Sequence, residues 1–373
     1  MFENIVIVAD DKIPGLEILL SPFTNVKFIP TGDFSRDSIA DANVLFVRTP
    51  VVCNSKLLEG SEVKYIGTAS IGFDHIDRAY CAEHGIEWRN APGCNKGSVL
   101  SYILASLSLI ALEREVRLSD LCIGIVGVGN IGGEIQRACK AIGMRVLLND
   151  PPRAEREGSE AFVSLDEIAE QCDIITFHTP MKREGDHPTF HLASQEFFSK
   201  LAKSPVIINA ARGGIIDEEA MVSAYDRGLV SDMIIDCWEN EPHINRELLS
   251  RVRVATPHIA GFSRDGKFNG TRMSVESMAR FFNIDVDSNI LKLPEPTNPH
   301  IDCTRFAKDV LCESVLATYD IEQESQDLKV SPEGFLRMRN GYPLRRDFCA
   351  YDIKNSPSRL VDLFGELGFV VVD

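Results

Sequence analysis

The chain has 373 residues, enough for two or three domains, and an ordinary globular composition with 44% apolar and 25% charged residues. Asp and Glu number 55 against 39 Lys and Arg, and the formal net charge of −16 argues against binding to nucleic acid or to an anionic membrane surface. A small anionic substrate is still compatible with this charge if a few basic side chains converge locally.

The ten cysteines are scattered and no two are spaced as C-x-x-C, so we expect reduced, mostly buried thiols and no metal site. The N-terminus carries an acid at position 3 and leads directly into a strand, which is not the pattern of a signal peptide. The longest uncharged run, residues 97–112, is too short and too rich in serine for a membrane span. We therefore expect a cytoplasmic protein.

The first part of the chain alternates short apolar runs with helix-like segments. Strands are predicted at residues 5–9, 26–29, 44–47, 63–66 and 86–88. Alternation at this spacing is typical of βαβ units and a parallel sheet. Polar residues follow two of the strands, in Arg48-Thr49 and in residues 67–72, where such sheets bind ligands, although simple turn chemistry explains them equally well.

A long apolar helix predicted at residues 99–112 leads into the pattern that organises the chain. An apolar strand at 121–126 runs into Gly127-Val-Gly129-Asn-Ile-Gly132, followed by a helix at 134–142 and a strand at 144–148. This G-x-G-x-x-G context predicts a dinucleotide site, with the pyrophosphate at the glycine turn and Asp150, after the second strand, on the ribose hydroxyls. Asp150 favours NAD over NADP, although Arg153 could in principle receive a 2′-phosphate.

Polar residues also follow four later strands. These strands are predicted at 174–177, 206–209, 234–235 and 252–255. Because the carboxyl ends of parallel strands face one crevice, we expect Arg212, Asp236, Glu241 and His258 to converge. Each has an ordinary structural explanation when taken alone, as a turn residue, a helix cap or a structural histidine. Chance convergence of all four is the weaker explanation.

These residue types suit hydride exchange between a nicotinamide and a 2-hydroxy acid. We expect Arg212 to grip the carboxylate and polarise the C2 oxygen. His258 would act as the acid/base, and Glu241 would hydrogen-bond its imidazole, favouring the imidazolium and fixing the tautomer. Asp236 would act separately, near the nicotinamide end of the cofactor.

The last third of the chain begins with a helix predicted at 269–282 and a proline-rich linker at 293–300. Beyond it, helices are predicted at 304–323, 336–340 and 358–367, and strands at 350–353 and 369–372. The expected fold class is α/β, with two doubly wound parallel-sheet (Rossmann-like) domains plus a small α+β C-terminal domain. The expected boundaries are 1–96 with 262–285 for the substrate domain, 97–261 for the NAD-binding domain and 286–373 for the C-terminal domain.

The C-terminal domain is expected to form a homodimer interface, because a unit of this size could hardly cover its own apolar helix face. That face comprises Leu360, Leu363, Phe364 and Leu367. Arg345 and Arg346 in the same domain have two interpretations. They are either solvated surface arginines or a charged element that reaches the partner's crevice and helps to hold a substrate phosphate.

The chain resembles the D-2-hydroxyacid dehydrogenase family over residues 1–285, through the motifs at 127–132, 178–180, 209–214, 236–242 and 256–261. It is similar to one group of that family over nearly its whole length, through residues 67–70, 91–95, 150–153 and the C-terminal Tyr342-Pro-Leu-Arg-Arg346. The resemblance implies NAD-dependent oxidation of a small phosphorylated 2-hydroxy acid, in a step of pyridoxal phosphate synthesis.

The resemblance also implies a role for individual residues. The catalytic residues would be Arg212, Glu241 and His258. The residues expected to bind NAD are Gly127, Gly129, Asn130, Ile131, Gly132, Asp150, Thr179, Ala210, Ala211, Arg212, Asp236 and Gly261. Those expected to bind the substrate are Thr49, Ser70 and Phe262.

The sequence departs from the family pattern at a few positions. Phe262 stands where the motif has a tyrosine that touches the substrate, so a hydroxyl is missing there. Thr49 and Ser70 stand where the family has Ser and Thr, so each site keeps a hydroxyl. Ser101 stands where the linking helix usually carries a glutamate. Phosphoglycerate dehydrogenase or glyoxylate/hydroxypyruvate reductase would keep the same triad and cofactor residues, and a dinucleotide-sensing binding protein is an alternative of a different class.

Overall fold

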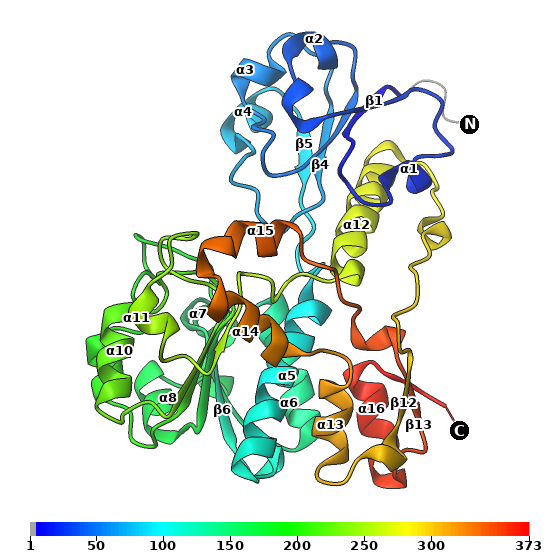
Figure 1. Cartoon of the computed structure of the whole chain (residues 1–373). Coiled ribbons are helices and arrows are strands. Elements are labelled where there is room, and N and C mark those ends of the chain that lie inside the picture. Colours follow the sequence, from blue (N-terminus) through cyan, green and yellow to red (C-terminus); the bar gives the residue numbers. More distant parts are fainter. Residues whose placement is uncertain (1–4, 373) are drawn as a thin grey trace. The chain divides into compact units, whose positions relative to one another are not determined.

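The computed structural model describes residues 5–372 (Figure 1). Residues 1–4, on which the expectation about a signal peptide depends, lie outside the described part. The chain divides into two units, residues 1–95 with 263–294 and residues 96–262 with 295–373. The second unit therefore includes the C-terminal segment, and the three-domain boundaries expected from the sequence stay a prediction.

The first unit contains a five-stranded parallel sheet with the order β2-β1-β3-β4-β5. Its strands are β1 (Ile7–Asp10), β2 (Val26–Ile29), β3 (Val44–Val47), β4 (Tyr65–Thr68) and β5 (Glu87–Arg89). They lie within about two residues of the predicted ones. Successive residues of β1 and β3 face opposite sides of the sheet, so that both sides are buried, as in other doubly wound folds.

Two sets of helices cover the two faces of this sheet. Helices α1 (Leu16–Leu19) and α12 (Arg264–Phe282) pack on the face of Ile7 and Val44. Helices α2 (Arg36–Ile39), α3 (Ser55–Leu58) and α4 (Arg78–Glu83) pack on the opposite face. Helix α12 begins before its predicted start because Ser263 accepts a hydrogen bond from the Gly266 N–H and caps it.

The second unit contains a six-stranded parallel sheet with the order β11-β10-β9-β8-β6-β7. Its strands are β6 (Cys122–Val126), β7 (Arg145–Asn149), β8 (Ile174–Phe177), β9 (Val206–Asn209), β10 (Asp232–Ile235) and β11 (Val254–Ala255). The chain leaves β6 for β7 on one side and returns to β8 on the other. This reversal of strand order is the point at which open α/β sheets bind ligands.

Helices cover both faces of the second sheet as well (Figure 1). One face carries α5 (Lys96–Arg114) and α6 (Asn130–Ile142), and the other carries α8 (Leu165–Gln171), α9 (Gln195–Ser199), α10 (Glu218–Asp226) and α11 (Arg246–Leu249). Helix α5 is long and apolar enough to cross a membrane by length and composition, but most of it is buried inside the protein. All ten cysteines are free and nine are buried, as the sequence predicted.

The C-terminal segment adds a small parallel sheet in the order β12-β13-β14. Its elements are β12 (His300–Asp302), α13 (Val310–Leu316), α14 (Ile321–Val330), α15 (Phe335–Asn340), β13 (Asp352–Lys354), α16 (Val361–Leu367) and β14 (Val370–Val371). Two predictions were wrong. The linker at 293–300 ends in a strand, and the single helix at 304–323 is divided because Asp309 and Asp320 cap two separate helices.

The apolar face on which the homodimer prediction rested is covered within the chain. Phe364 is 0% and Leu367 2% exposed, and helix α16 packs against α6 in the core of the second unit. That argument was therefore wrong: the C-terminal segment does not leave this face open, because it lies on α5 and α6 and shares their core (Figure 1). Dimer formation itself stays a prediction.

Candidate active site

The glycine turn after β6 has the geometry of a dinucleotide site. A Cβ on Gly132 would lie 2.0 Å from the Gly127 carbonyl oxygen, and Gly127 itself has a φ of 90°. Those two glycines are required by the fold. A Cβ on Gly129 would meet nothing within 4 Å, so the protein itself gives no reason for a glycine there. Gly129 opens the N-terminus of α6, where no side chain caps the helix, and Asn130 and Ile131 follow it. Open space beside free N–H groups fits a pyrophosphate.

Asp150 lies at the carboxyl end of β7, as predicted. Its Oδ2 accepts a hydrogen bond from the Val128 N–H at 2.8 Å, and its Oδ1 accepts one from the Arg153 N–H at 3.1 Å. These two bonds fix the carboxylate beside the glycine turn. The Arg153 side chain is bound to Glu157, with Nη2 2.6 Å from its Oε2. A cation that is already paired is a poor receptor for a 2′-phosphate, which favours NAD.

A pocket of about 320 Å³ lies between the loops after β6, β7 and β8, and Gly129, Asp150 and Thr179 line it. Nδ1 of His178 and Oγ1 of Thr179 are buried there, and neither has a hydrogen-bond partner in residues 5–372. Burial lowers the pKa of His178 to about 3, so its ring is neutral. Orphaned buried polar atoms beside a glycine turn fit a bound dinucleotide.

The loop after β9 carries Arg212. The Asn209 side chain donates to the carbonyl oxygens of Arg212 at 3.0 Å and Cys237 at 3.2 Å, and so ties this loop to the one after β10. A Cβ on Gly213 would lie 1.8 Å from the Trp238 carbonyl oxygen, so the two loops touch through backbone. Ala210 and Ala211 are each 8% exposed, whereas the Arg212 side chain is exposed and has no carboxylate partner in the described chain.

His258 and Glu241 form the pair that the sequence predicted. His258 Nδ1 lies 2.8 Å from Glu241 Oε2, and the two side chains are 25% and 24% exposed. Glu241 is held in turn by the Trp238 N–H, which donates to Oε1 at 3.0 Å. Since Nδ1 donates its proton to the carboxylate, Nε2 is the ring nitrogen left for a substrate hydroxyl.

The loop that carries His258 is fixed by Asp236. Oδ1 of Asp236 accepts from the Ile259 N–H at 2.7 Å, and Oδ2 accepts from the Ala260 N–H at 3.0 Å. Thr256 Oγ1 also donates to this carboxylate. Asp236 is 1% exposed, and burial raises its pKa. The structure thus gives Asp236 a clear part in positioning the loop, while its contact with the cofactor, like that of the half-buried Gly261, stays a prediction.

Arg345 holds the carbonyl groups of the same two residues, Ile259 and Ala260. Its Nη2 donates to the Ala260 carbonyl at 2.6 Å, and its Nη1 donates to the Ile259 carbonyl at 3.2 Å. Arg345 is only 9% exposed, so both expectations for it, a solvated arginine or one reaching a partner's crevice, were wrong. Arg346 is half-buried and its role stays a prediction.

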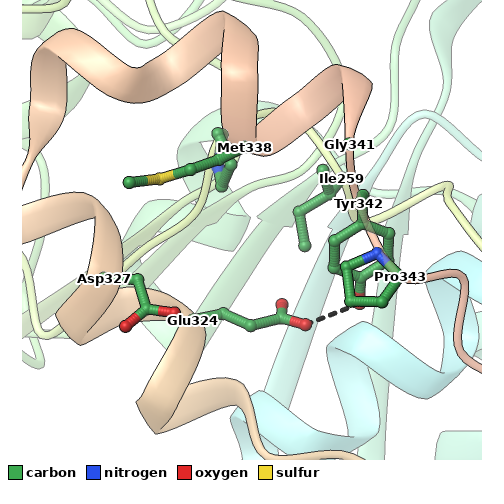
Figure 2. A pocket seen from close by; sticks show the side chains of 8 residues that line it. Ile259, Glu324, Asp327, Met338, Gly341, Tyr342 and Pro343 are labelled. Carbon is green, nitrogen blue, oxygen red and sulfur yellow. Dashed lines mark hydrogen bonds between the residues drawn. The ribbon is translucent and has the colours of Figure 1, made fainter.

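A buried network supports Arg345 from α14. Tyr342 accepts a hydrogen bond from Arg345 Nη1 at 2.9 Å. Its hydroxyl donates to Glu324 Oε1 at 2.6 Å, as Figure 2 shows. Tyr319 donates to the other oxygen of Glu324. Burial raises the pKa of Glu324 and the Arg345 charge opposes this effect. Sequence reasoning noticed the motif around Tyr342 but missed this role, because no spacing pattern reveals a network that forms only in the folded chain.

The site also contains three groups that could hold a metal ion. Ligand atoms of Cys237, Glu241 and His258 lie within 4.8 Å of one another. Burial raises the pKa of the Cys237 thiol, while His258 and Glu241 already contact each other at 2.8 Å. The contact between His258 and Glu241 suits an acid/base pair, and the expectation that the site holds no metal stays a prediction.

The residues expected to touch the substrate lie in both units, each of which is described by itself. In the first unit, Thr49 is exposed after β3, and Ser70 follows β4, where its hydroxyl donates to the Gly72 carbonyl at 2.8 Å. In the second unit, Phe262 is half-buried and its ring centroid lies 6.4 Å from that of Tyr342. The Tyr342 hydroxyl is engaged with Glu324, so it does not replace the hydroxyl missing at Phe262. Substrate contact at all three positions stays a prediction.

Comparisons with known proteins agree with this geometry. Residues 111–260 match the model of the D-isomer specific 2-hydroxyacid dehydrogenase NAD-binding domain. The chain is 48% identical to the erythronate-4-phosphate dehydrogenase of Bacteroides thetaiotaomicron, over 93% of this chain and 98% of that protein. It is 40% identical to the protein of the same name from Porphyromonas gingivalis, over 98% of this chain and 99% of that one.

The chain belongs to the erythronate-4-phosphate dehydrogenase family. Among solved structures, it is similar to the D-lactate dehydrogenase of Aquifex aeolicus in complex with NAD and lactic acid, with a TM-score of 0.56 and 25% identity over 74% of this chain and 95% of that one. The NAD-binding domain and the neighbours with NAD bound give NAD as the cofactor. Residues 292–368, which include Arg345, match the model of a domain of unknown function. That model assigns no role to this segment.

Proposed function

We propose that the protein oxidises 4-phospho-D-erythronate to 2-oxo-3-hydroxy-4-phosphobutanoate with NAD, in a step of pyridoxal phosphate synthesis. The family relationship over nearly the full chain supports the substrate and the reaction. The single structural observation that carries the proposal is the His258–Glu241 pair, at 2.8 Å, on a loop of the NAD-binding unit.

The chemistry follows from the groups on these loops. NAD bound at the glycine turn supplies the acceptor for the hydride that leaves C2 of the substrate. His258 Nε2 takes the proton of the C2 hydroxyl as the carbonyl forms, and Glu241 holds the ring in the tautomer that this transfer needs. Arg212 binds the carboxylate and keeps C2 in place. In the reverse direction, His258 returns the proton to the same oxygen.

The direct test is turnover by the purified protein. Formation of NADH, followed by absorbance, is expected with 4-phospho-D-erythronate at a higher kcat/KM than with 3-phospho-D-glycerate or glycolate. Preference for one of the latter two would assign the protein to another reaction of the same chemistry. Absence of NADH with every 2-hydroxy acid, despite tight NADH binding, would overturn the proposal and favour a dinucleotide-sensing role.

We also propose that the protein is a cytoplasmic homodimer that pairs through its C-terminal segment. Large apolar side chains are exposed there, Val330 at 71% and Leu336 at 49%. Light scattering of the full chain tests this, with Val330→Asp and Leu336→Glu as the disrupting changes. A monomeric wild-type chain would contradict the proposal. Removing the whole segment is a poor test, because it would also expose the core under α13 and α16.

A further inference from the structure

Helix α15 brings a second guanidinium to the loop of the catalytic histidine. Phe335, at the start of α15, is 1% exposed in the core under the second sheet and anchors the helix. Four residues later, Arg339 Nε lies 3.3 Å from the carbonyl oxygen of His258. Its Cζ lies 5.3 Å from the centroid of the Phe262 ring, which gives the guanidinium a second contact on the same loop.

His258 has an unusual backbone conformation at this contact. Its φ of 57° is in the left-handed region, uncommon for a residue with a side chain, and its N–H donates to the Asp236 carbonyl at 2.9 Å. The His258 carbonyl is the acceptor for Arg339. The guanidinium is thus tied to the residue whose side chain transfers the proton.

The charge of Arg339 is not neutralised by the protein. In residues 5–372, no carboxylate lies within ion-pair distance of its guanidinium, and its Nη atoms donate to no acceptor. Arg345 differs, because both of its Nη atoms donate to backbone carbonyls or to Tyr342. A half-buried guanidinium with free donors, in a chain of net charge −16, is suited to binding an anion from solution.

Arg212 is a second cation without a carboxylate partner in the described residues. Ligand atoms of Cys237, Glu241 and His258 lie within 4.8 Å of one another, and the positive charges of Arg212 and Arg339 both act on the Cys237 thiol. Burial dominates the raised pKa of the Cys237 thiol, and the positive charges of these two arginines oppose it. The charges of two separate guanidinium groups therefore reach the Cys237 thiol, which adjoins the acid/base pair. The substrate proposed above also carries two anionic groups, a carboxylate and a phosphate.

We propose that Arg339 binds the phosphate group of the substrate, leaving Arg212 for the carboxylate. The proposal rests on the proposed function for the identity of the phosphate ester. Arg339 is a binding residue that sets specificity, since a 2-hydroxy acid without a phosphate would leave its donors unused. The remaining Nη donors suit the several oxygens of a phosphate.

The test compares two substrates in three variants. Arg339→Gln should lower kcat/KM for 4-phospho-D-erythronate by about 10- to 100-fold, mainly through KM, and leave kcat/KM for D-erythronate nearly unchanged. Arg339→Lys should restore part of the loss because it keeps the charge. Arg337→Gln, on the exposed side of the same helix, is the matched control and should behave as wild type. An equal loss with both substrates, or no loss, would overturn the proposal.

A binding measurement separates this inference from the proposed function. Calorimetric titration of the NADH complex with inorganic phosphate should give weaker binding in Arg339→Gln than in wild type, with NADH affinity the same in both. This outcome does not depend on turnover, so a wild-type protein inactive on 4-phospho-D-erythronate would contradict the proposed function alone. Equal phosphate affinity in the two proteins would contradict the role of Arg339.

Discussion

The glycine turn and the loop of His258, which we propose as the catalytic loop, both follow strands of one sheet, but they are held in different ways. The glycine turn is built from one strand–helix–strand unit, and backbone contacts such as Gly132 against Gly127 fix its shape. The His258 loop is held between Asp236, which accepts hydrogen bonds from the N–H groups of Ile259 and Ala260, and Arg345, which donates to the carbonyl groups of the same two residues. A cofactor site can thus be local, whereas this acid/base site depends on a distant part of the chain.

The largest effect on turnover is expected from substitution of the residues that we propose as catalytic. His258→Ala removes proton transfer and should lower kcat by about 10²- to 10⁴-fold. NADH should still bind with near-native affinity, measured by its fluorescence, because the glycine turn does not use the imidazole. Arg212→Ala should lower kcat/KM by a comparable factor, because the substrate carboxylate loses its binding partner. Wild-type turnover in His258→Ala would remove this residue from the mechanism.

The dependence of the catalytic loop on the C-terminal segment is tested next. Arg345→Ala leaves the two carbonyls and the buried Glu324 without their cation, and should lower the free energy of unfolding by about 3 kcal/mol. Urea denaturation measures this, and kcat should fall as well because the loop loses one side of its support. Arg359→Ala, at an exposed arginine of the same segment, is the control. If Arg345→Ala matched this control, the loop would not need the network.

The glycine turn offers an internal comparison of two alanine substitutions. Gly132→Ala places a methyl group 2.0 Å from the Gly127 carbonyl and should lower the free energy of unfolding by about 2 kcal/mol. Gly129→Ala has open space and should leave stability nearly unchanged, while NAD binding weakens because the methyl occupies the place of the pyrophosphate. Thermal unfolding and NADH titration read out the two effects. Unchanged NADH affinity in Gly129→Ala would show that the turn is structural only.

The smallest predicted effect concerns pH. Burial raises the pKa of Glu218 from 4.5 to about 7, and this carboxyl accepts a hydrogen bond from the Glu239 N–H beside the catalytic loop. Between these pH values the folded chain keeps a proton that the unfolded chain has lost, so stability falls as pH rises from about 4.5 to 7. Between pH 5 and pH 8, the free energy of unfolding should fall by about 1–2 kcal/mol less in Glu218→Gln than in wild type, measured by urea titration. An identical pH dependence in the variant would contradict the assignment.

The strands and the glycine turn could be predicted from the sequence because buried apolar runs and glycine spacing are local signals. The convergence of His258 and Glu241 followed from the rule that parallel strands share one carboxyl edge. Strand β12 escaped prediction because three residues after a proline-rich stretch carry no pattern. Arg345 was misjudged because an isolated sequence arginine looks solvated, and only the folded chain supplies Glu324 and the loop carbonyls that bury it.

The same limit explains the error over the apolar face of α16. Leu360, Phe364 and Leu367 are a regular helical stripe, and the sequence identifies such a stripe but not what covers it. The structure supplies α6 as the cover. Arguments from an uncovered face to a second subunit therefore need the packing of the whole chain first.

The central claim is that the two differently built loops work together to move a hydride from C2 of a phosphorylated 2-hydroxy acid while His258 takes the hydroxyl proton. The most direct measurement uses 4-phospho-D-erythronate carrying deuterium at C2, with the reduced cofactor analysed by NMR. The account predicts that wild type places the deuterium at C4 of the nicotinamide ring and that His258→Ala does so far more slowly. Reduced cofactor without deuterium would contradict it.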